Sequence, residues 1–388
     1  MNSLKRIYLD YAATTPVDPV VLEAMLPYYD KNFGNPSSMH SFGQRSAKAL
    51  QDSRQIVAKA IGAKDEEIIF TSSATESANL AIKGAAFANK SKGNHIIISA
   101  IEHDCVLNTA SWLKKQGFEI TLVGVDKYGM IDPEDIEKSI KKETILVSVM
   151  WANNEIGTIE PVEEIGEICR KKNILFHSDA AQAFGKIPID VSKINIDLLT
   201  ASSHKIYGPL GAALLYIKQG TLVEPILHGG GQERNLRSST ENLPAIVGFA
   251  KATEIAMENI KSENSRLAKL RDKLIAGVLK NISDSYLNGH PEKRLSNNVN
   301  VRFSYVEGES MMMELDSYGI AVSTGSACSS PKLEPSHVLL ALGLRPEEIH
   351  GSVRISLGRW TTEGEIDYLL DILPKVVGKL RKISPFAN

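Results

Sequence analysis

The feature that most constrains the fold is a regular alternation of short apolar runs and amphipathic segments between residues 67 and 217. The apolar runs predict strands at residues 67–70, 95–99, 119–123, 145–150, 175–177, 198–201 and 212–217. Helical spacing of apolar residues predicts helices between them at 75–88, 104–116, 133–140 and 162–172. Short apolar strands that alternate with helices form a largely parallel sheet covered on both faces. The predicted fold class is therefore α/β.

The length of 388 residues exceeds the usual size of a single core, so one large and one smaller domain are expected. Helices are expected before the alternation, at about 20–29 and 47–61, and a polar loop at 228–242 follows it. A long helical region at 244–281 follows, with a domain boundary near residue 260. The remaining pattern predicts a smaller α+β domain with strands at 298–303 and 353–357, helices at 309–318 and 363–380, a loop at 323–335 and a short helix that ends at 342. We place the large domain at residues 15–260 and the small domain at residues 1–14 and 261–388.

Composition excludes several classes of function. A formal net charge of -2 gives no basic surface for nucleic acid. No apolar run approaches the ~20 residues of a membrane span, and the N-terminus lacks the apolar core of a signal peptide. A cytoplasmic location is therefore expected, with neither nucleic acid nor membrane as a partner. Three scattered cysteines without a CxxC pair exclude a disulfide framework and the commonest zinc sites.

One lysine stands where a lysine is not expected. Lys205 follows an apolar run at residues 196–201 after Ser202-Ser203-His204, and a Gly-Pro break comes shortly behind it. An amine in a confined site loses its charge readily and can form a Schiff base with an aldehyde. We interpret Lys205 as the residue that carries pyridoxal phosphate. The alternative is an ordinary surface lysine after a strand.

Polar residues also follow the other predicted strands, and each has a purely structural alternative. The segment Ser72–Glu76 opens a helix whose N-terminus suits a phosphate, although it could be a plain cap. His103 could stack on a cofactor ring or only begin a helix. Asn153 and Asn154 suit a phenolic oxygen or a carboxylate, or only a turn. Asp179 could pair with a protonated pyridinium, or form a helix cap or a structural ion pair.

The second half of the chain adds a thiol and an arginine. Cys328 lies in a small, polar, glycine-containing stretch, so we expect it to be exposed and mobile, with an unperturbed thiol pKa of ~8.5. Cys105 and Cys169 lie in apolar helical patterns and are predicted to be buried. Arg354 alternates with apolar residues on a strand and could bind a carboxylate through both of its amino groups. The alternative for Arg354 is an inter-domain salt bridge.

The order of these features resembles fold-type I pyridoxal phosphate enzymes, in which a phosphate-binding helix start, a His, an Asp and a Lys follow successive strands. More closely, the sequence resembles the cysteine desulfurases of the NifS/IscS type over essentially its whole length. The matching motifs lie at residues 8–16, 33–36, 74–77, 153–157, 204–209, 228–233, 325–328 and 354–359.

The resemblance implies a role for each residue. Lys205 binds the cofactor as a Schiff base, Asp179 pairs with the pyridinium, His103 stacks on the ring, and Arg354 binds the carboxylate of L-cysteine. Cys328 attacks the substrate sulfur, leaving L-alanine and a persulfide. The resemblance also implies that the cofactor phosphate is bound by Ala74, Thr75, Ser202, His204 and the partner subunit's Thr240. It places Gln182 and Asn154 around the phenolic oxygen and the substrate.

The resemblance further implies a homodimer that donates sulfur to an iron–sulfur scaffold protein or another acceptor. Cys328 is a possible ligand of a transient 2Fe–2S cluster shared with that scaffold. The rival interpretations are a selenocysteine lyase, another class-V aminotransferase-type enzyme, or a sulfur-transfer protein without a cofactor. Ser73, Ser203 and Ser239 depart from the family, which usually has glycine there. If one of these positions needs a positive φ, a cost of about 1 kcal/mol or more is expected.

Overall fold

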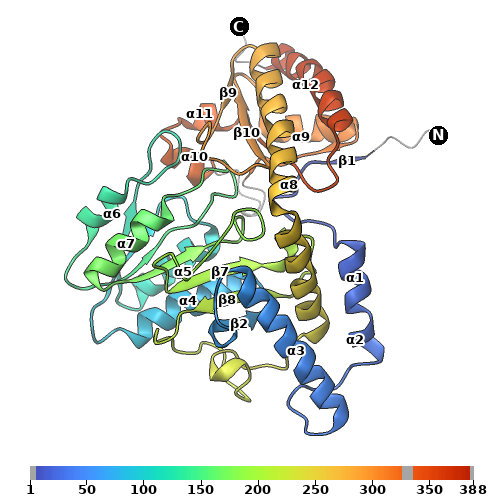
Figure 1. The fold of residues 1–388 in the computed structure, drawn as a ribbon. Coiled ribbons are helices and arrows are strands. Elements are labelled where there is room, and N and C mark those ends of the chain that lie inside the picture. Colours follow the sequence, from blue (N-terminus) through green and yellow to red (C-terminus); the bar gives the residue numbers. More distant parts are fainter. Residues whose placement is uncertain (1–5, 326–334, 385–388) are drawn as a thin grey trace.

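A seven-stranded sheet forms the centre of the larger part of the molecule (Figure 1). The computed structural model describes residues 6–325 and 335–384. Within these residues the strand order is β2-β8-β7-β6-β5-β3-β4. The strands are β2 (Ile68–Thr71), β3 (His95–Ser99), β4 (Glu119–Val123), β5 (Thr144–Ser148), β6 (Leu175–Asp179), β7 (Leu198–Ser202) and β8 (Ala213–Ile217). β8 is antiparallel to both of its neighbours and the other pairs are parallel, which confirms the largely parallel sheet.

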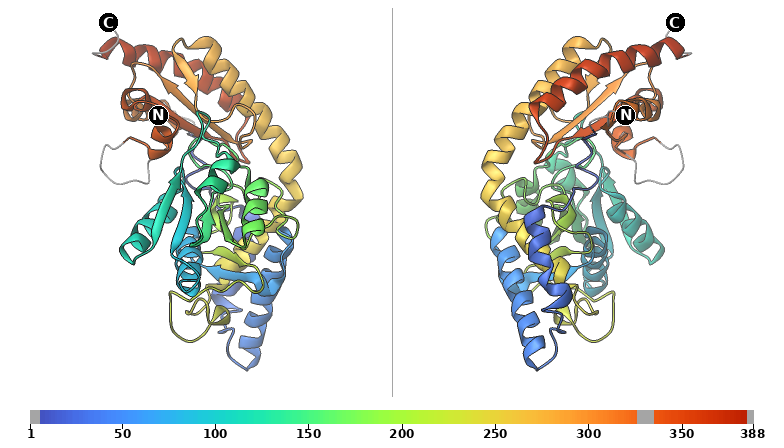
Figure 2. Two further views of the ribbon diagram at one scale, coloured as in Figure 1. Left: turned by 90° about the vertical axis from the view of Figure 1, so that its left-hand side faces the viewer. Right: turned by 90° about the vertical axis from the view of Figure 1, so that its right-hand side faces the viewer.

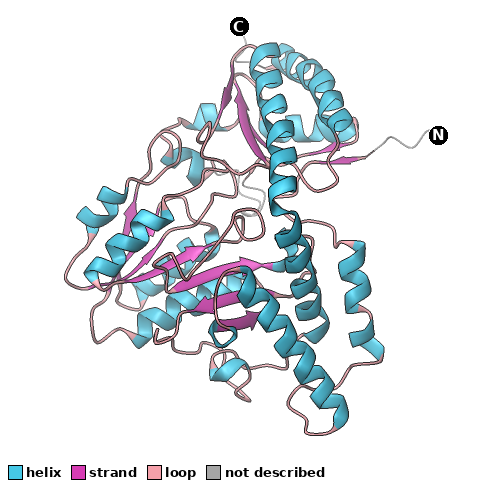
Figure 3. Ribbon diagram, viewed as in Figure 1, coloured by secondary structure: helices cyan, strands magenta, loops and turns pink. Residues whose placement is uncertain are grey.

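Helices cover both faces of this sheet (Figure 3). Successive residues of β3 show why the sheet needs two covers: Ile96 and Ile98 belong to one apolar core, and Ile97 belongs to another. Helices α4 and α5 contribute to the first core, and α3, α7 and α8 to the second. The bounds are α3 (Ser41–Ala60), α4 (Ala74–Ala88), α5 (Asp104–Lys115), α6 (Pro133–Ser139), α7 (Val162–Lys172) and α8 (Leu243–Asn281).

The N-terminal helices differ from the expectation at two points. The helix expected at 20–29 is divided into α1 (Pro19–Met25) and α2 (Pro27–Asp30), because Pro27 begins a new helix. The helix expected at 47–61 begins six residues earlier, where the His40 ring accepts a hydrogen bond from the Gly43 amide. Gly43 also lies so close to the Ser38 carbonyl that a Cβ atom would be 2.2 Å from it. The spacing of apolar residues in the sequence does not predict a helix start that depends on a cap and a close backbone contact.

A third apolar core lies above the sheet and combines both ends of the chain. Its sheet is antiparallel, in the order β12-β10-β9, and β1 pairs in parallel with β11. Ile7 and Leu9 from the start of the chain pack in the same core as Leu357 and Ile366 from its end. The elements are β1 (Ile7–Tyr8), β9 (Ser285–Leu287), β10 (Asn298–Phe303), β11 (Ile320–Ala321), β12 (Ser352–Ser356), α9 (Gly308–Ser317), α10 (His337–Ala341), α11 (Pro346–Ile349) and α12 (Glu363–Ile383).

The long helix α8 runs past both parts of the molecule (Figure 2). Its buried residues up to Ala256 belong to the core under the sheet, and those from Leu267 onward belong to the third core. The change of core falls near residue 260, where we place the domain boundary. The boundaries at 14 and 260 themselves stay predictions. Among the described residues, no helix combines the length and the apolar character needed to cross a membrane.

Candidate active site

A cavity of about 250 Å³ lies at the carboxyl ends of the strands. Ligands gather at this edge in α/β sheets because loops and helix N-termini meet there. The cavity is lined by most of the residues that the sequence singled out, namely Ala74, Thr75, His103, Asn154, Asp179, Gln182, His204, Lys205 and Arg354. Two of the predicted cofactor ligands, Ser202 and Thr240, are not among the described residues that line it. Ser202 is the last residue of β7, and Thr240 lies in the loop before α8.

Lys205 directs its amine into the molecule. It is the last residue of a short 3-10 helix, η2 (Ser203–Lys205), that directly follows β7. Its Nζ donates to the carbonyls of Ala12 and Ala13 at 2.7 and 2.8 Å. The interpretation of Lys205 as an ordinary surface lysine does not fit these contacts. The neighbouring His204 is held neutral, because burial and then the charge of Lys205 lower its pKa to about 4.

Asp179 ends β6 as a buried carboxyl group. One carboxylate oxygen accepts from the Ala181 amide at 2.9 Å, and no ion pair to Asp179 occurs among the described residues. Burial raises its pKa, while the Ala181 amide and the charges of His103 and Lys205 oppose the rise. A buried carboxylate in this position fits a cationic ligand group, as a pyridinium is. The pairing of Asp179 with a pyridinium stays a prediction.

His103 caps α5 and faces the cavity at the same time. Its Nδ1 accepts from the Cys105 amide at 3.1 Å, so this nitrogen carries no proton. The helix-start alternative is therefore confirmed, and because the ring also lines the cavity, stacking on a cofactor stays a prediction. The preceding Glu102 is fully buried, and burial followed by the charge of Asp179 holds its pKa well above the ordinary value.

The start of α4 combines a helix cap with exposed first-turn amides. The Ser73 hydroxyl accepts from the Glu76 amide at 3.1 Å, as expected for a cap. Ala74 and Thr75 follow on the cavity wall, where the first amides of a 15-residue helix have no partner inside the helix. Burial alone would raise the pKa of Glu76, but hydrogen bonds from Arg237 and Ser72 hold it below its ordinary value.

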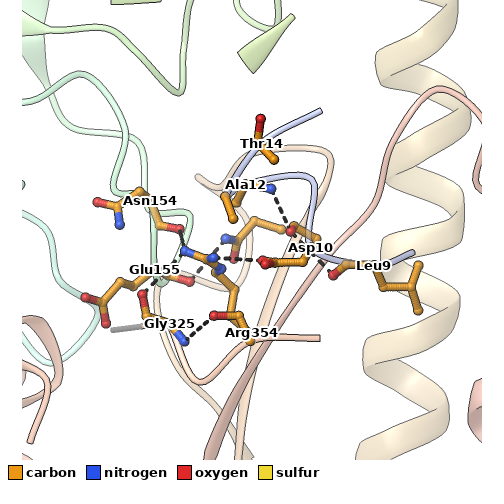
Figure 4. Close-up of polar contacts among 12 residues, drawn as sticks. Leu9, Asp10, Ala12, Thr14, Asn154, Glu155, Gly325 and Arg354 are labelled. Atoms are coloured by element: carbon orange, nitrogen blue, oxygen red, sulfur yellow. Dashed lines mark hydrogen bonds and ion pairs between the residues drawn. The ribbon is translucent and has the colours of Figure 1, made fainter. Parts of the chain in front are cut away.

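Arg354 projects from β12 into the same cavity (Figure 4). Its Nη2 donates to Asp10 at 2.8 Å, and its Nη1 donates to the carbonyls of Asn154 and Gly325 at 3.2 and 3.5 Å. Arg354 thus forms a salt bridge with Asp10, but both residues lie in the predicted small domain, so this pair is not the inter-domain salt bridge that the sequence offered as an alternative. However, Nε is buried without a hydrogen-bond partner among the described residues.

The three serines at usual glycine positions behave differently. Ser73 has φ −163°, which any residue adopts, and its side chain forms the cap of α4. Ser203 is fully buried, with its hydroxyl unpartnered among the described residues and packed against Gly208. Only Ser239 of the three has a positive φ, at 146°. The expected cost of replacing glycine therefore falls on Ser239 alone.

The two cysteines that the structure describes, Cys105 and Cys169, are not suited to act as nucleophiles. Cys105 lines the cavity but is buried, and burial raises the pKa of its thiol far above the ordinary value. Burial raises the pKa of Cys169 to about 12. Both stay protonated at neutral pH, which confirms that they are core residues. Cys328 lies outside the described residues, and with it the predicted nucleophile and cluster ligand.

Sequence reasoning missed three residues at the site. Asp10 binds Arg354, Glu155 lines the cavity and accepts from the Ser336 hydroxyl at 2.6 Å, and Lys186 donates to Gln182 at 2.9 Å. Lys186 carried a signal that could have been used, because it lies four residues after Gln182. Asp10 and Glu155 lie in the matching motifs but carried no further sequence signal, since their partners, Arg354 and Ser336, are distant in sequence.

The comparisons with known proteins agree with this geometry. The model of the aminotransferase class-V family matches residues 7–369. Cysteine desulfurase IscS of Methanosarcina thermophila is 55% identical, over 98% of this chain and 94% of that protein. Cysteine desulfurase IscS 1 of Archaeoglobus fulgidus is 54% identical, over 97% and 98%. The chain therefore belongs to the class-V aminotransferase family.

Comparison with solved structures indicates which members of the class-V aminotransferase family this chain resembles. A NifS-like protein has a TM-score of 0.91 at 40% identity, covering 96% of this chain and all of the other. A structure described as SspA in complex with cysteine has a TM-score of 0.81 at 38% identity, covering 92% and 100%. Within the class-V family, the chain is placed among the NifS/IscS-like cysteine desulfurases, and its fold is that of fold-type I pyridoxal phosphate enzymes.

Proposed function

We propose that this protein is a pyridoxal phosphate-dependent cysteine desulfurase. It removes sulfur from L-cysteine, forms L-alanine, and carries the sulfur as a persulfide on Cys328 for iron–sulfur cluster assembly. One observation carries the proposal: a single cavity is lined by the Lys205 amine, the Asp179 carboxyl group and the Arg354 guanidinium. The relatives named cysteine desulfurase match the chain over nearly its full length.

The residues around the cavity fit pyridoxal phosphate. When bound, the cofactor supplies an electron sink that weakens bonds at the substrate carbon atoms. Lys205 would hold it covalently, Asp179 would keep its ring nitrogen protonated, and His103 would stack on the ring. The phosphate would lie at the start of α4 with Ser202 and His204 nearby, and Gln182 and Asn154 would contact the phenolic oxygen and the substrate. The free first-turn amides of α4 support the phosphate position.

The substrate would be oriented by its carboxylate. We assign this task to Arg354, because its guanidinium is a cation and the residue lines the cavity. The Cys328 thiolate would then take the sulfur atom: an S–S bond forms, the C–S bond of L-cysteine breaks, and the carbon receives a proton to give L-alanine. A thiolate is the nucleophilic form of cysteine. Neither of the two described cysteines provides one at neutral pH.

The finer points on partners and location stay proposals. We propose a homodimer in which the partner subunit's Thr240 completes the phosphate site, since Thr240 does not line the cavity of its own chain. Exposed apolar residues support such an interface, among them Leu26, Tyr29, Phe33 and Met39. A scaffold protein would accept the sulfur, with Cys328 as a possible 2Fe–2S ligand. A cytoplasmic location is the accompanying prediction.

Sulfide release in dithiothreitol tests the proposal directly. Cys328→Ala is expected to lose sulfide release from L-cysteine while keeping the visible absorption of the bound cofactor. Cys169→Ala, which changes a buried thiol far from the chemistry, is the matched control and keeps both properties. Lys205→Ala should lose the visible absorption itself. Retained sulfide release in the Cys328 variant would overturn the desulfurase assignment and favour an enzyme in which this thiol is incidental.

A further inference from the structure

A second lysine lies behind Lys205 on the opposite side of Gln182. Lys186 follows β6 by seven residues, in the turn that continues from Asp179. Its Nζ donates to the Gln182 side-chain oxygen at 2.9 Å. Lys186 and Lys205 also line a separate small cavity of about 20 Å³ together with Glu263 and Arg359. None of the expected site roles uses Lys186.

The contact with Lys186 determines which way the Gln182 amide faces. An ammonium group has three donors and no acceptor, so the atom of Gln182 that meets it must be the oxygen. The amide nitrogen is then turned the other way, where it donates to the Ala12 carbonyl at 2.9 Å. The same carbonyl accepts from Lys205. Lys186 is therefore connected to the Lys205 amine through one amide and one carbonyl.

We propose that Lys186 is a positioning residue: it holds the Gln182 oxygen, so that the amide nitrogen donates one hydrogen to Ala12 and keeps its second hydrogen for the cofactor, and it places a positive charge behind the amide. A donor directed at the cofactor's phenolic oxygen stabilises the negative charge of that oxygen. A flipped amide would present its own oxygen there and would repel it. The positive charge of Lys186 acts in the same direction as the donor. Lys186 thus sets how strongly the bound cofactor retains its proton.

The charged groups around Lys186 determine its state. Burial lowers the pKa of Lys186 to about 7, the charges of Lys205 and Arg354 lower it as well, and Glu263 on α8 opposes them. Arg359 faces the same small cavity, but its guanidinium is paired with Asp18 and Glu263. A Schiff base at Lys205 would carry no positive charge once it is unprotonated, and the phenolic oxygen of the cofactor would add a negative charge near Gln182. Both changes favour the ammonium form of Lys186, which is the form that fixes the amide.

The visible absorption of the cofactor-loaded enzyme, titrated with pH in the absence of L-cysteine, tests the inference. Lys186→Met should raise the midpoint of this titration by several tenths of a unit to about 1 unit, because a charge at 4–6 Å shifts a pKa by about 1–3 units and Lys186 acts from farther away, through the intervening Gln182 amide. Lys186→Arg keeps the positive charge and can only donate hydrogen bonds to the Gln182 oxygen, so its midpoint should equal that of the parent enzyme. Lys171→Met, which removes an exposed lysine on α7, is the matched control and should not move it.

The outcomes separate a positioning role from a merely structural one. An unchanged midpoint in Lys186→Met, with only a lower Tm, would overturn the inference. If Lys186→Met does not fold, Lys186→Gln provides the same test, because it can donate to Gln182 without carrying a charge. The inference rests on the proposed cofactor but not on the desulfuration step. An enzyme that binds the cofactor yet releases no sulfide would refute the proposed reaction and leave this titration interpretable.

Discussion

Arg54 and Glu233 form a buried, bidentate ion pair beneath the loop that leads to Thr240. The two guanidinium nitrogens donate to the two carboxylate oxygens at 2.8 and 2.7 Å, and the Phe70 amide donates to the same carboxylate at 2.8 Å. The side chains are only 7% and 1% exposed. Glu233 itself and the two residues that follow it, Arg234 and Asn235, have positive φ angles of 45°, 58° and 64°. The ion pair therefore holds a strained stretch of backbone in place.

Removing the arginine should be costly because it leaves a buried carboxylate without its cation. We predict that Arg54→Met lowers the free energy of unfolding by about 3–5 kcal/mol, the typical cost of breaking such a pair. With an unfolding entropy of about 2.1 cal/mol/K per residue, this corresponds to a Tm decrease of roughly 4–6 °C for a chain of this length. Urea denaturation followed by circular dichroism and differential scanning calorimetry measure the two quantities.

A double variant separates the buried charge from the lost packing. In Arg54→Met/Glu233→Gln, the amide oxygen can still accept from the Phe70 amide and no charge is buried. We expect this variant to recover at least half of the stability that Arg54→Met loses. The reasoning is refuted if Arg54→Met costs less than about 1 kcal/mol, a value typical of exposed pairs, or if the double variant is no more stable than the single one.

Two further predictions concern backbone strain and pH. Ser239→Gly should raise the free energy of unfolding by about 1 kcal/mol, because glycine adopts a positive φ more easily than serine does. Ser73→Gly should not raise it, because Ser73 has an extended backbone and its side chain caps α4. Urea denaturation of both variants checks the contrast. Burial raises the pKa of Glu160 to about 8, so the folded protein binds a proton that the unfolded chain releases near pH 4.5, and stability from this group falls as pH rises between those values. Glu160→Gln should therefore reduce the loss of stability between pH 5 and 8, and a Tm series that is identical to that of the parent protein would contradict the assignment.

The sequence predicts those parts of the fold that depend on local pattern. The strand at residues 95–99 and the helix at 162–172 are found with the predicted bounds, because the apolar spacing that defines each element lies within its own segment. The reversed direction of β8 was not predicted, since a five-residue apolar strand reads the same in both orientations. The start of α3 was missed because it depends on the close approach of Gly43 to Ser38. Such contacts belong to the folded chain and not to a pattern.

The same distinction holds at the site. Asp179 and Lys205 could be predicted because Asp179 ends β6 and Lys205 follows β7 by three residues, and the cavity brings them together. Glu155 could not be predicted, because its partner is distant in sequence, and the only signal for Lys186 was its position four residues after Gln182. Their importance comes from the side chains they meet, Gln182 and Ser336. The resemblance to a family supplied roles for matching motifs, but it did not supply this second layer of contacts.

The N-terminal segment at residues 10–15 shows why the site needs both ends of the chain. Its backbone carbonyls accept from Lys205 and Gln182 of the sheet part, while Asp10 binds Arg354 of the other part. The segment is thus hydrogen-bonded to residues that follow it by about 170 to 344 positions. A displacement of either part would change the direction of the Lys205 amine and of the Arg354 guanidinium together. The proposed cofactor attachment at Lys205 and the proposed carboxylate binding at Arg354 would therefore be coupled through this segment, and a change in it should affect both.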